Sequence, residues 1–237
     1  MFKDKLIKFK NFLLDMVYPN DIKCMFCDND VANGCICDEC LKENIFNEGN
    51  RCIKCDAKIK EGNIVCDHCK NHKRYFEQCF CPFDYTGKVR ASILKFKSDG
   101  AKYLAEHFVK FIYEKLMIEN VVFDVIVPVP SHTKTIKKRG YNPAKVLADE
   151  LAKLSNKPVC DVLCKNQPTQ NQKFLNFEER QNNLKDSISL TDSKSIKGKN
   201  VLIIDDVVTT CATVNTCAKL MDKAGFVYVC AIARTNF

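Results

Sequence analysis

Apolar and polar positions alternate in blocks along the chain from about residue 80 onwards. Short apolar runs predict β-strands at Phe80–Tyr85, Phe123–Val129, Pro158–Leu163, Val201–Asp205 and Phe226–Ala233. Stretches with helical periodicity predict helices near Lys88–Lys97, Ala101–Ile118, Pro143–Ser155 and Ala212–Ala224, with Gly225 as the C-terminal cap of the last. This alternation is typical of an α/β fold, in which helices flank a mostly parallel sheet and ligands bind at the carboxyl ends of its strands.

Residues 1–20 carry the pattern of an amphipathic helix. Within Met1–Val17, apolar residues such as Phe2 and Leu6 fall on one face, and lysines lie off it. Such a helix packs on the body of the protein or, alternatively, docks on a partner or a membrane surface. No apolar run in the chain reaches the ~20 residues of a membrane span, and the segment lacks the continuous apolar region of a signal peptide. We therefore expect a soluble, cytoplasmic protein without a stable membrane span.

Residues 21–76 are rich in cysteine. Eight of the 16 cysteines form four Cys-x-x-Cys knuckles: Cys24/Cys27, Cys37/Cys40, Cys52/Cys55 and Cys66/Cys69. Two such knuckles supply the four thiolates of a tetrahedral Zn²⁺ site, and four sulfur ligands leave no open position for catalysis. We therefore expect one or two structural zinc ions. Sequential and cross-brace pairing of the knuckles both remain open, and Cys35 could substitute as a ligand.

The segment Val201–Val214 carries the most chemical information. Apolar residues run into Asp205 and Asp206, and a threonine-rich turn and a helical pattern follow. The free N–H groups and positive dipole end of a helix N-terminus suit a phosphate, and threonine hydroxyls add donors. The two carboxylates can accept hydrogen bonds from sugar hydroxyls or hold the waters of a metal ion.

This segment resembles the phosphoribosyl-pyrophosphate (PRPP) signature of type I phosphoribosyltransferases. The resemblance implies that the acids face the ribose hydroxyls, that the loop holds the 5-phosphate, and that Mg²⁺ binds together with PRPP. The implied PRPP-binding residues are Asp205, Asp206, Thr209, Thr210, Cys211, Ala212 and Thr213. Cys211 stands where the family usually has glycine, so we expect this residue to have a negative φ or the loop to open slightly.

Further motifs make the chain similar to the ComF family of competence proteins. They are Ile93–Phe96, Val127–Pro130, Arg139–Asn142 and the spacing Gln-x2-Leu-x4-Arg-x2-Asn that begins at Gln172. Pro143 departs from the family, which often has glutamine there. The resemblance runs from about Cys24 to Arg234 and implies a zinc-finger module at residues 21–76 joined to a type I phosphoribosyltransferase-like domain at residues 77–237.

The same resemblance implies a pyrophosphate loop after Val129 and a lid over the site. The candidates are Ser131, Lys134, Arg139, Gly140, Asn142, Gln172, Arg180 and Asn183, with Lys137 and Lys138 as further basic residues of the loop. An arginine suits a pyrophosphate because it donates in a fork, and Gly140 permits the sharp turn that presents Arg139.

The implied function is natural transformation, in which the protein binds PRPP and handles single-stranded DNA together with a DNA-uptake helicase or other competence proteins. The alternative is an active phosphoribosyltransferase, with an unidentified acceptor, as in nucleobase salvage; no catalytic residue is identified. The net charge of +8 favours phosphate backbones. A basic linker beside the last knuckle mixes charge with an aromatic ring, as single-strand binders do; it comprises Lys70, Lys73, Arg74 and Tyr75.

Overall fold

The computed structural model describes residues 23–31, 34–43, 45–165 and 187–236. The chain divides into two compact units, Met1–Asn44 and Ile45–Phe237. The cysteine-rich module expected over residues 21–76 therefore spans the boundary between the units. The expected helix at Met1–Val17 lies outside the described residues.

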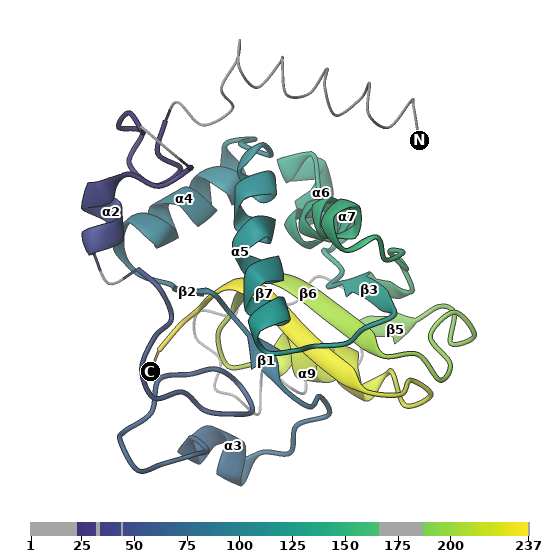
Figure 1. The fold of residues 1–237 in the computed structure, drawn as a ribbon. Helices are drawn as coiled ribbons and strands as arrows, with labels where there is room; N and C mark the ends of the chain where they lie inside the picture. The colour runs from purple at the N-terminus through teal and green to yellow at the C-terminus, as the bar shows by residue number, and fades with distance from the viewer. Residues whose placement is uncertain (1–22, 32–33, 44, 166–186, 237) are drawn as a thin grey trace, which may run out of the picture. The chain divides into compact units, whose positions relative to one another are not determined.

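The larger unit is built on a parallel sheet (Figure 1). Its strands are β1 (Cys79–Phe80), β2 (Phe83–Asp84), β3 (Val125–Pro128), β6 (Val201–Val208) and β7 (Val227–Arg234). β6 and β7 lie in the middle, β3 pairs with the outer edge of β6, and both β1 and β2 pair with the outer edge of β7. The predicted parallel sheet is thereby confirmed.

Helices cover both faces of the sheet (Figure 1). On one face, α5 (Leu104–Ile118) packs against α7 (Pro143–Ser155), with α4 (Gly87–Ser98) beside α5. α9 (Ala212–Lys219) packs against β6 on the other face. Alternate strand residues, among them Val127, Ile203 and Val229, form one buried cluster with α9, because successive strand side chains point to opposite faces.

Several short elements lie outside the main sheet and its long helices. α2 (Asp38–Lys42) lies in the smaller unit, and α3 (Asp67–Asn71) follows the third knuckle in the larger one. A two-stranded antiparallel sheet consists of β4 (Leu163–Lys165) and β5 (Ile188–Leu190). No helix within the described ranges has the length and apolar character that crossing a membrane requires.

Two predicted strands differ from the observed ones. The strand expected at Phe80–Tyr85 is interrupted at Cys81 and Pro82, and proline cannot donate to a strand ladder. It becomes β1 and β2. The stretch Pro158–Leu163 forms only an isolated bridge from Val159 to Ile126, and regular pairing starts at Leu163 in β4.

The helix predictions hold best where a cap is encoded locally. α7 has the predicted bounds because the Asn142 side chain accepts a hydrogen bond from the Ala144 N–H and Pro143 takes the first helical position. α9 ends at Lys219 instead of Ala224, so the prediction that Gly225 caps it is wrong. Gly225 is instead needed for close packing, since a Cβ there would lie 2.8 Å from Oδ1 of Asn200.

Candidate functional site

A cavity of about 430 Å³ opens where β3 and β6 end. Its lining joins the acid pair of β6 to the segment that follows β3 and to Thr213 of α9. The acids lie within β6 rather than at its end, because β6 continues to Val208. Pairing with β3 stops at Ile204, however, so Asp205 and Asp206 extend beyond the neighbouring strand. The structure thus brings the two predicted binding segments together at the carboxyl edge of the sheet, where ligands of such folds bind.

Two lysines compensate the charge of the acid pair. Lys97 Nζ, at the end of α4, lies 2.6 Å from Asp206 Oδ1, and Lys165 of β4 lines the same cavity. Burial and the neighbouring charge of Asp206 raise the pKa of Asp205 to about 7, although Lys97 opposes this shift. Burial also lowers the pKa of Lys165. The result is a partly buried set of opposite charges, in which burial acts on the pKa of both Asp205 and Lys165.

The segment after β3 forms a short helix, α6 (Thr133–Arg139), where a loop was expected. The His132 side chain caps it by accepting a hydrogen bond from the Lys134 N–H, 3.1 Å away. Gly140 ends it in the left-handed conformation, with φ of +86°, as its predicted turn role requires. Lys134 and Arg139, rather than the other two lysines of this helix, line the cavity.

Ser131 and Asn142 hold the two ends of this segment together. Ser131 Oγ donates to Asn142 Oδ1 at 2.9 Å, and Asn142 Nδ2 donates to the Val129 carbonyl at 2.9 Å. Both residues also line the cavity. These hydrogen bonds fix the two ends of the segment that contains α6, and so they position Lys134 and Arg139 at the cavity.

The loop Thr209–Cys211 joins β6 to the N-terminus of α9. Cys211 is only 2% exposed and has φ of +64°, so the expected negative φ is wrong. Its side chain is buried and interacts with the Cys55 thiol. Thr209 and Thr213 line a hollow of about 20 Å³ at this helix end, and Thr210 Oγ1 accepts a hydrogen bond from the Ala212 N–H at 3.4 Å.

The cysteine knuckles form two tetrads. Cys24, Cys27, Cys37 and Cys40 make the first tetrad, and Cys52, Cys55, Cys66 and Cys69 make the second; within each, all four sulfurs lie within 4.8 Å of one another. The sequential pairing is therefore the one that the structure adopts, and Cys35 belongs to neither tetrad. The sulfurs of Cys27 and Cys37 are 3.5 Å apart and those of Cys55 and Cys66 are 3.6 Å apart. Four thiolates ~2.3 Å from Zn²⁺ would be ~3.8 Å apart, so both tetrads fit a structural zinc ion.

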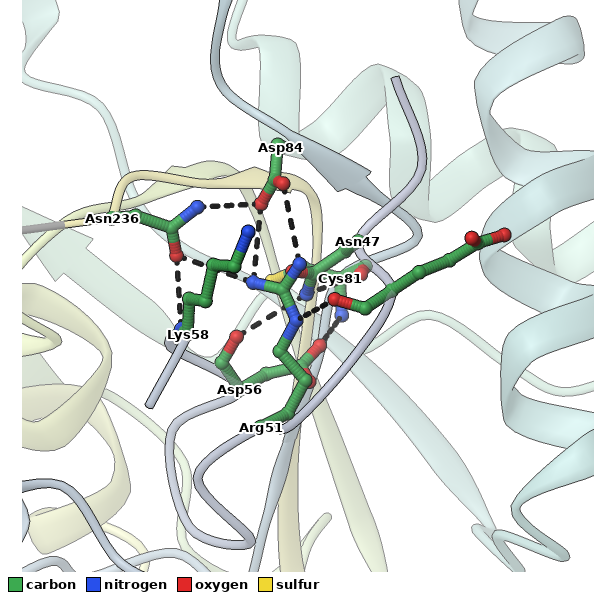
Figure 2. Close-up of polar contacts among 8 residues, drawn as sticks. Asn47, Arg51, Asp56, Lys58, Cys81, Asp84 and Asn236 are labelled. Atoms are coloured by element: carbon green, nitrogen blue, oxygen red, sulfur yellow. Dashed lines mark hydrogen bonds and ion pairs between the residues drawn. The ribbon is translucent and has the colours of Figure 1, made fainter. Parts of the chain in front are cut away.

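The second tetrad is part of the larger unit and is tied to the sheet by buried polar contacts (Figure 2). Arg51 forms a two-pronged contact with Asp84 of β2, with both N–O distances at 3.2 Å. Asn236, just beyond β7, donates to the same carboxylate at 2.7 Å. Asp56, next to Cys55, accepts a hydrogen bond from the Cys81 N–H at 2.7 Å. These contacts attach the third knuckle, Cys52/Cys55, directly to the strands of the sheet.

The basic linker is divided between the surface and the interior. Arg74 donates from Nε to the Cys69 sulfur at 3.2 Å, so its predicted role as a surface cation for DNA is not supported. Lys73 and Tyr75 are exposed, and the Lys73 Nζ lies 5.1 Å from the centre of the Tyr75 ring. Lys219 of α9 approaches the same ring at 5.6 Å. The resulting patch, Lys73–Tyr75–Lys219, combines two cations and an aromatic ring.

Sequence reasoning missed Lys97, Lys165 and His132 as residues of the cavity. Lys97 ends a predicted helix and Lys165 follows a predicted strand, but nothing in their local sequence distinguishes them from surface lysines. His132 could have been noticed as a side chain able to cap the helix that follows. Three lid candidates, Gln172, Arg180 and Asn183, lie outside the described residues.

Comparison with known proteins agrees with this arrangement. The phosphoribosyl transferase domain family matches residues 104–234. Competence protein F of Haemophilus influenzae is 24% identical over 86% of this chain and 93% of its own length. DNA utilization protein YhgH of Escherichia coli is 24% identical over 90% of this chain and 96% of its own. Competence protein ComFC of Bacillus subtilis is 31% identical over 43% of this chain and 39% of its own.

Proposed function

Because the chain belongs to the phosphoribosyl transferase domain family, as a ComF-type member, we propose that it binds PRPP with Mg²⁺ in the cavity beyond the paired ends of β3 and β6 and handles single-stranded DNA during DNA uptake. The observation that carries the proposal is the meeting, in one cavity, of the acid pair on β6 with the basic residues of α4 and α6. We place this function in the cytoplasm, with a structural zinc ion in each cysteine tetrad.

Each part of PRPP has a matching group in the cavity or in the hollow at the start of α9. Asp205 and Asp206 would accept hydrogen bonds from the ribose hydroxyls. The loop Thr209–Cys211 and the N-terminus of α9 would hold the 5-phosphate, since the N–H groups there have no partner within the helix. Lys134 and Arg139 would bind the pyrophosphate. Mg²⁺, when bound, would neutralise pyrophosphate charge and join it to the ribose oxygens.

Lys97 balances the negative charge of the acid pair in this proposal. Its ion pair with Asp206 neutralises one negative charge in a site that must also bind the anionic PRPP. Without Lys97, two adjacent carboxylates would repel both each other and the incoming phosphates. Lys97 therefore favours the ionised acid pair that the ribose hydroxyls need.

Calorimetric titration with PRPP and Mg²⁺ tests this proposal. We expect the variant Asp205→Asn with Asp206→Asn to lose PRPP binding, because a neutral amide is a weaker acceptor for hydroxyls than a carboxylate. Asp222→Asn is the matched control, since Asp222 is exposed and follows the far end of α9. Unchanged affinity in the double variant would exclude the acid pair, and no binding by the unmodified protein would exclude the PRPP proposal.

Single-stranded DNA is the second proposed ligand, and the Lys73–Tyr75–Lys219 patch supports it. Stacking on an exposed aromatic ring together with phosphate contacts from nearby lysines is how single strands are bound without sequence preference. Asn215 of α9 fixes this patch by accepting a hydrogen bond from the Tyr75 N–H at 2.9 Å and donating to the Lys73 carbonyl at 3.0 Å. These two hydrogen bonds hold the backbone of Lys73 and Tyr75 against α9.

The salt dependence of DNA binding tests the patch. Lys73→Ala with Lys219→Ala should weaken binding and lower the slope of log affinity against log salt by about 1.4, because two phosphate contacts are lost. Lys60→Ala with Lys223→Ala changes the net charge equally at other exposed positions. An unchanged slope in the first variant, or an equal decrease in both, would place the DNA elsewhere.

The alternative function is pentosyl transfer to an acceptor. Its reaction would release pyrophosphate from PRPP, which can be measured directly with nucleobases as candidate acceptors. Pyrophosphate release that requires Asp205 and Asp206 would favour the enzyme over a PRPP-binding protein.

A further inference from the structure

The proposed phosphate loop has the second cysteine tetrad immediately behind it. Cys55 and Cys211 belong to the same buried cluster on the α9 face of the sheet, and so do Val208 and Ala212 on either side of the loop. The loop therefore lines the small hollow at the start of α9 and shares a buried cluster with a metal-binding knuckle. Three side chains join the knuckles to the loop.

Arg234, the last residue of β7, makes the most extensive of these connections. It is fully buried, and its guanidinium donates from Nε to the Cys55 carbonyl at 2.8 Å. The same guanidinium donates to the carbonyls of Val208, at 3.0 Å, and Thr209, and its remaining nitrogen lies 3.7 Å from the Cys55 sulfur. One planar, permanently charged group thus holds the start of the loop and a metal-binding cysteine in a fixed relation.

Cys211 makes the second connection. Its buried side chain interacts with the Cys55 thiol, and its backbone is left-handed, with φ of +64°. A side chain costs about 1–2 kcal/mol in that conformation, so the contact with Cys55 offsets a real strain. A cysteine in place of glycine therefore connects the loop to the metal-binding knuckle.

His68 makes the third connection from α3, between the last two cysteines of the second tetrad. Its Nε2 lies 3.2 Å from the carbonyl oxygen of Thr210, the central residue of the loop. The ring also lies close to that of His72, tilted by 55°, with 4.6 Å between ring centres. Since the backbone of α3 is positioned by Cys66 and Cys69, the position of His68 depends on how these two cysteines are held.

We propose that the second tetrad, through Arg234, Cys211 and His68, sets the conformation of the loop Thr209–Cys211, so that phosphate binding depends on the metal ion of this tetrad. The proposal rests on the proposed PRPP site, but it makes a separate claim about the loop. In this description Arg234 and His68 are positioning residues, since both contact loop carbonyls and leave the loop N–H groups for the ligand. The metal ion supplies rigidity to the knuckles and takes no part in chemistry.

The first experiment changes His68 and leaves the tetrad intact. His68→Ala should speed hydrogen exchange at the amides of residues 209–213 and weaken PRPP binding about fivefold, the effect of one lost hydrogen bond. His68→Gln should restore both values, because its amide can donate to the Thr210 carbonyl. Asn71→Ala changes an exposed side chain of the same helix and leaves that hydrogen bond in place, so it should change neither value. Zinc content, measured by mass spectrometry, should be equal in all variants.

The second experiment removes the metal ion. The variant Cys24→Ser with Cys27→Ser confines zinc to the second tetrad, and a chelator then removes the remaining ion. We expect exchange at residues 209–213 to rise while the amides of β6 and β7 stay protected. Equal exchange before and after removal would overturn the proposal. Simultaneous loss of protection in the strands would also overturn it, because the ion would then hold the whole unit rather than the loop.

The two claims fail in distinguishable ways. Hydrogen exchange reports on the loop in the absence of PRPP. Faster exchange on zinc removal, in a protein that does not bind PRPP, would therefore support the dependence of the loop on the metal ion and reject the PRPP site. PRPP binding of equal affinity in zinc-loaded and zinc-free protein would support the PRPP site and reject the dependence of the loop on the metal ion.

Discussion

Single residues in this protein are set by contacts that a local sequence pattern does not contain. Cys211 occupies a backbone conformation that favours glycine, yet its thiol is buried against Cys55. Asp205 has a pKa near 7 because burial and Asp206 act on the same carboxyl group. Both properties arise from neighbours supplied by the fold.

The strain at Cys211 predicts an unusual order of stabilities. Cys211→Ala keeps the strained backbone and loses the thiol contact, whereas Cys211→Gly loses the contact but relieves the strain. We expect the alanine variant to be less stable than the glycine variant by about 1 kcal/mol. Denaturant unfolding of the zinc-loaded variants measures the difference. The reverse order would mean that the backbone at residue 211 carries no strain.

The raised pKa of Asp205 predicts how stability depends on pH. Between about pH 4 and pH 7 the folded protein keeps a proton on Asp205 that the unfolded chain releases, so the free energy of unfolding falls as pH rises through this window. Asp205→Asn removes the ionisation. We expect this variant to be more stable than the unmodified protein at pH 8 and the difference to shrink towards pH 4. Unfolding curves at both values measure it, and a difference independent of pH would contradict the assignment.

At the level of elements, the turn between α9 and β7 is held by side-chain packing and not by a helix cap. α9 stops at Lys219, and the chain then turns so that Gly225 donates its N–H to the Lys199 carbonyl at 2.8 Å. Asn200 accepts a hydrogen bond from the Phe226 N–H at 3.1 Å through the oxygen that lies closest to Gly225. The turn therefore sets where β7 begins.

Gly225→Ala should destabilise the larger unit by about 1–3 kcal/mol, the usual cost of forcing extra atoms into a filled space. The added Cβ would lie 2.8 Å from Asn200 Oδ1, and moving that side chain breaks its bond to Phe226. Thermal unfolding measures the loss. Lys223→Ala, at an exposed position of the same turn, should change stability little; a larger effect there than at Gly225 would contradict the packing argument.

On the scale of the whole molecule, the first tetrad and the second tetrad belong to different compact units. The second shares the buried cluster of the sheet, in which Cys52, Ala57 and Phe76 lie beside strand and α9 residues. We therefore propose a functional division of the chain after residue 44 in preference to the division after residue 76 suggested by the cysteine pattern.

Two truncated chains test this division. A chain of residues 45–237 should fold, hold one zinc ion and bind PRPP, because it keeps the second tetrad and the complete cluster. A chain of residues 77–237 should aggregate, since it exposes the apolar surface that Phe76 and the knuckles cover. Zinc analysis and size-exclusion chromatography distinguish the two. Equal behaviour of both chains would contradict the integration of the second tetrad.

The sequence alone determined the features that depend on neighbours in the chain. Apolar runs predicted β3, β6 and β7, Gly140 was expected to permit a sharp turn, and the two-residue cysteine spacing predicted the metal tetrads. The acid pair and the threonine-rich turn predicted a loop for phosphate at the start of a helix. These features were predictable because their physical causes act over a few residues.

The tertiary structure decided which of these features meet. His68 reaches Thr210 across 142 positions and Arg234 reaches Cys55 across 179, and no periodicity or spacing encodes contacts of such range. The same holds for Lys97 beside Asp206, for the pKa of Asp205, and for the left-handed Cys211. These properties depend on burial and on charges or thiols from distant segments, which become neighbours only when the sheet forms.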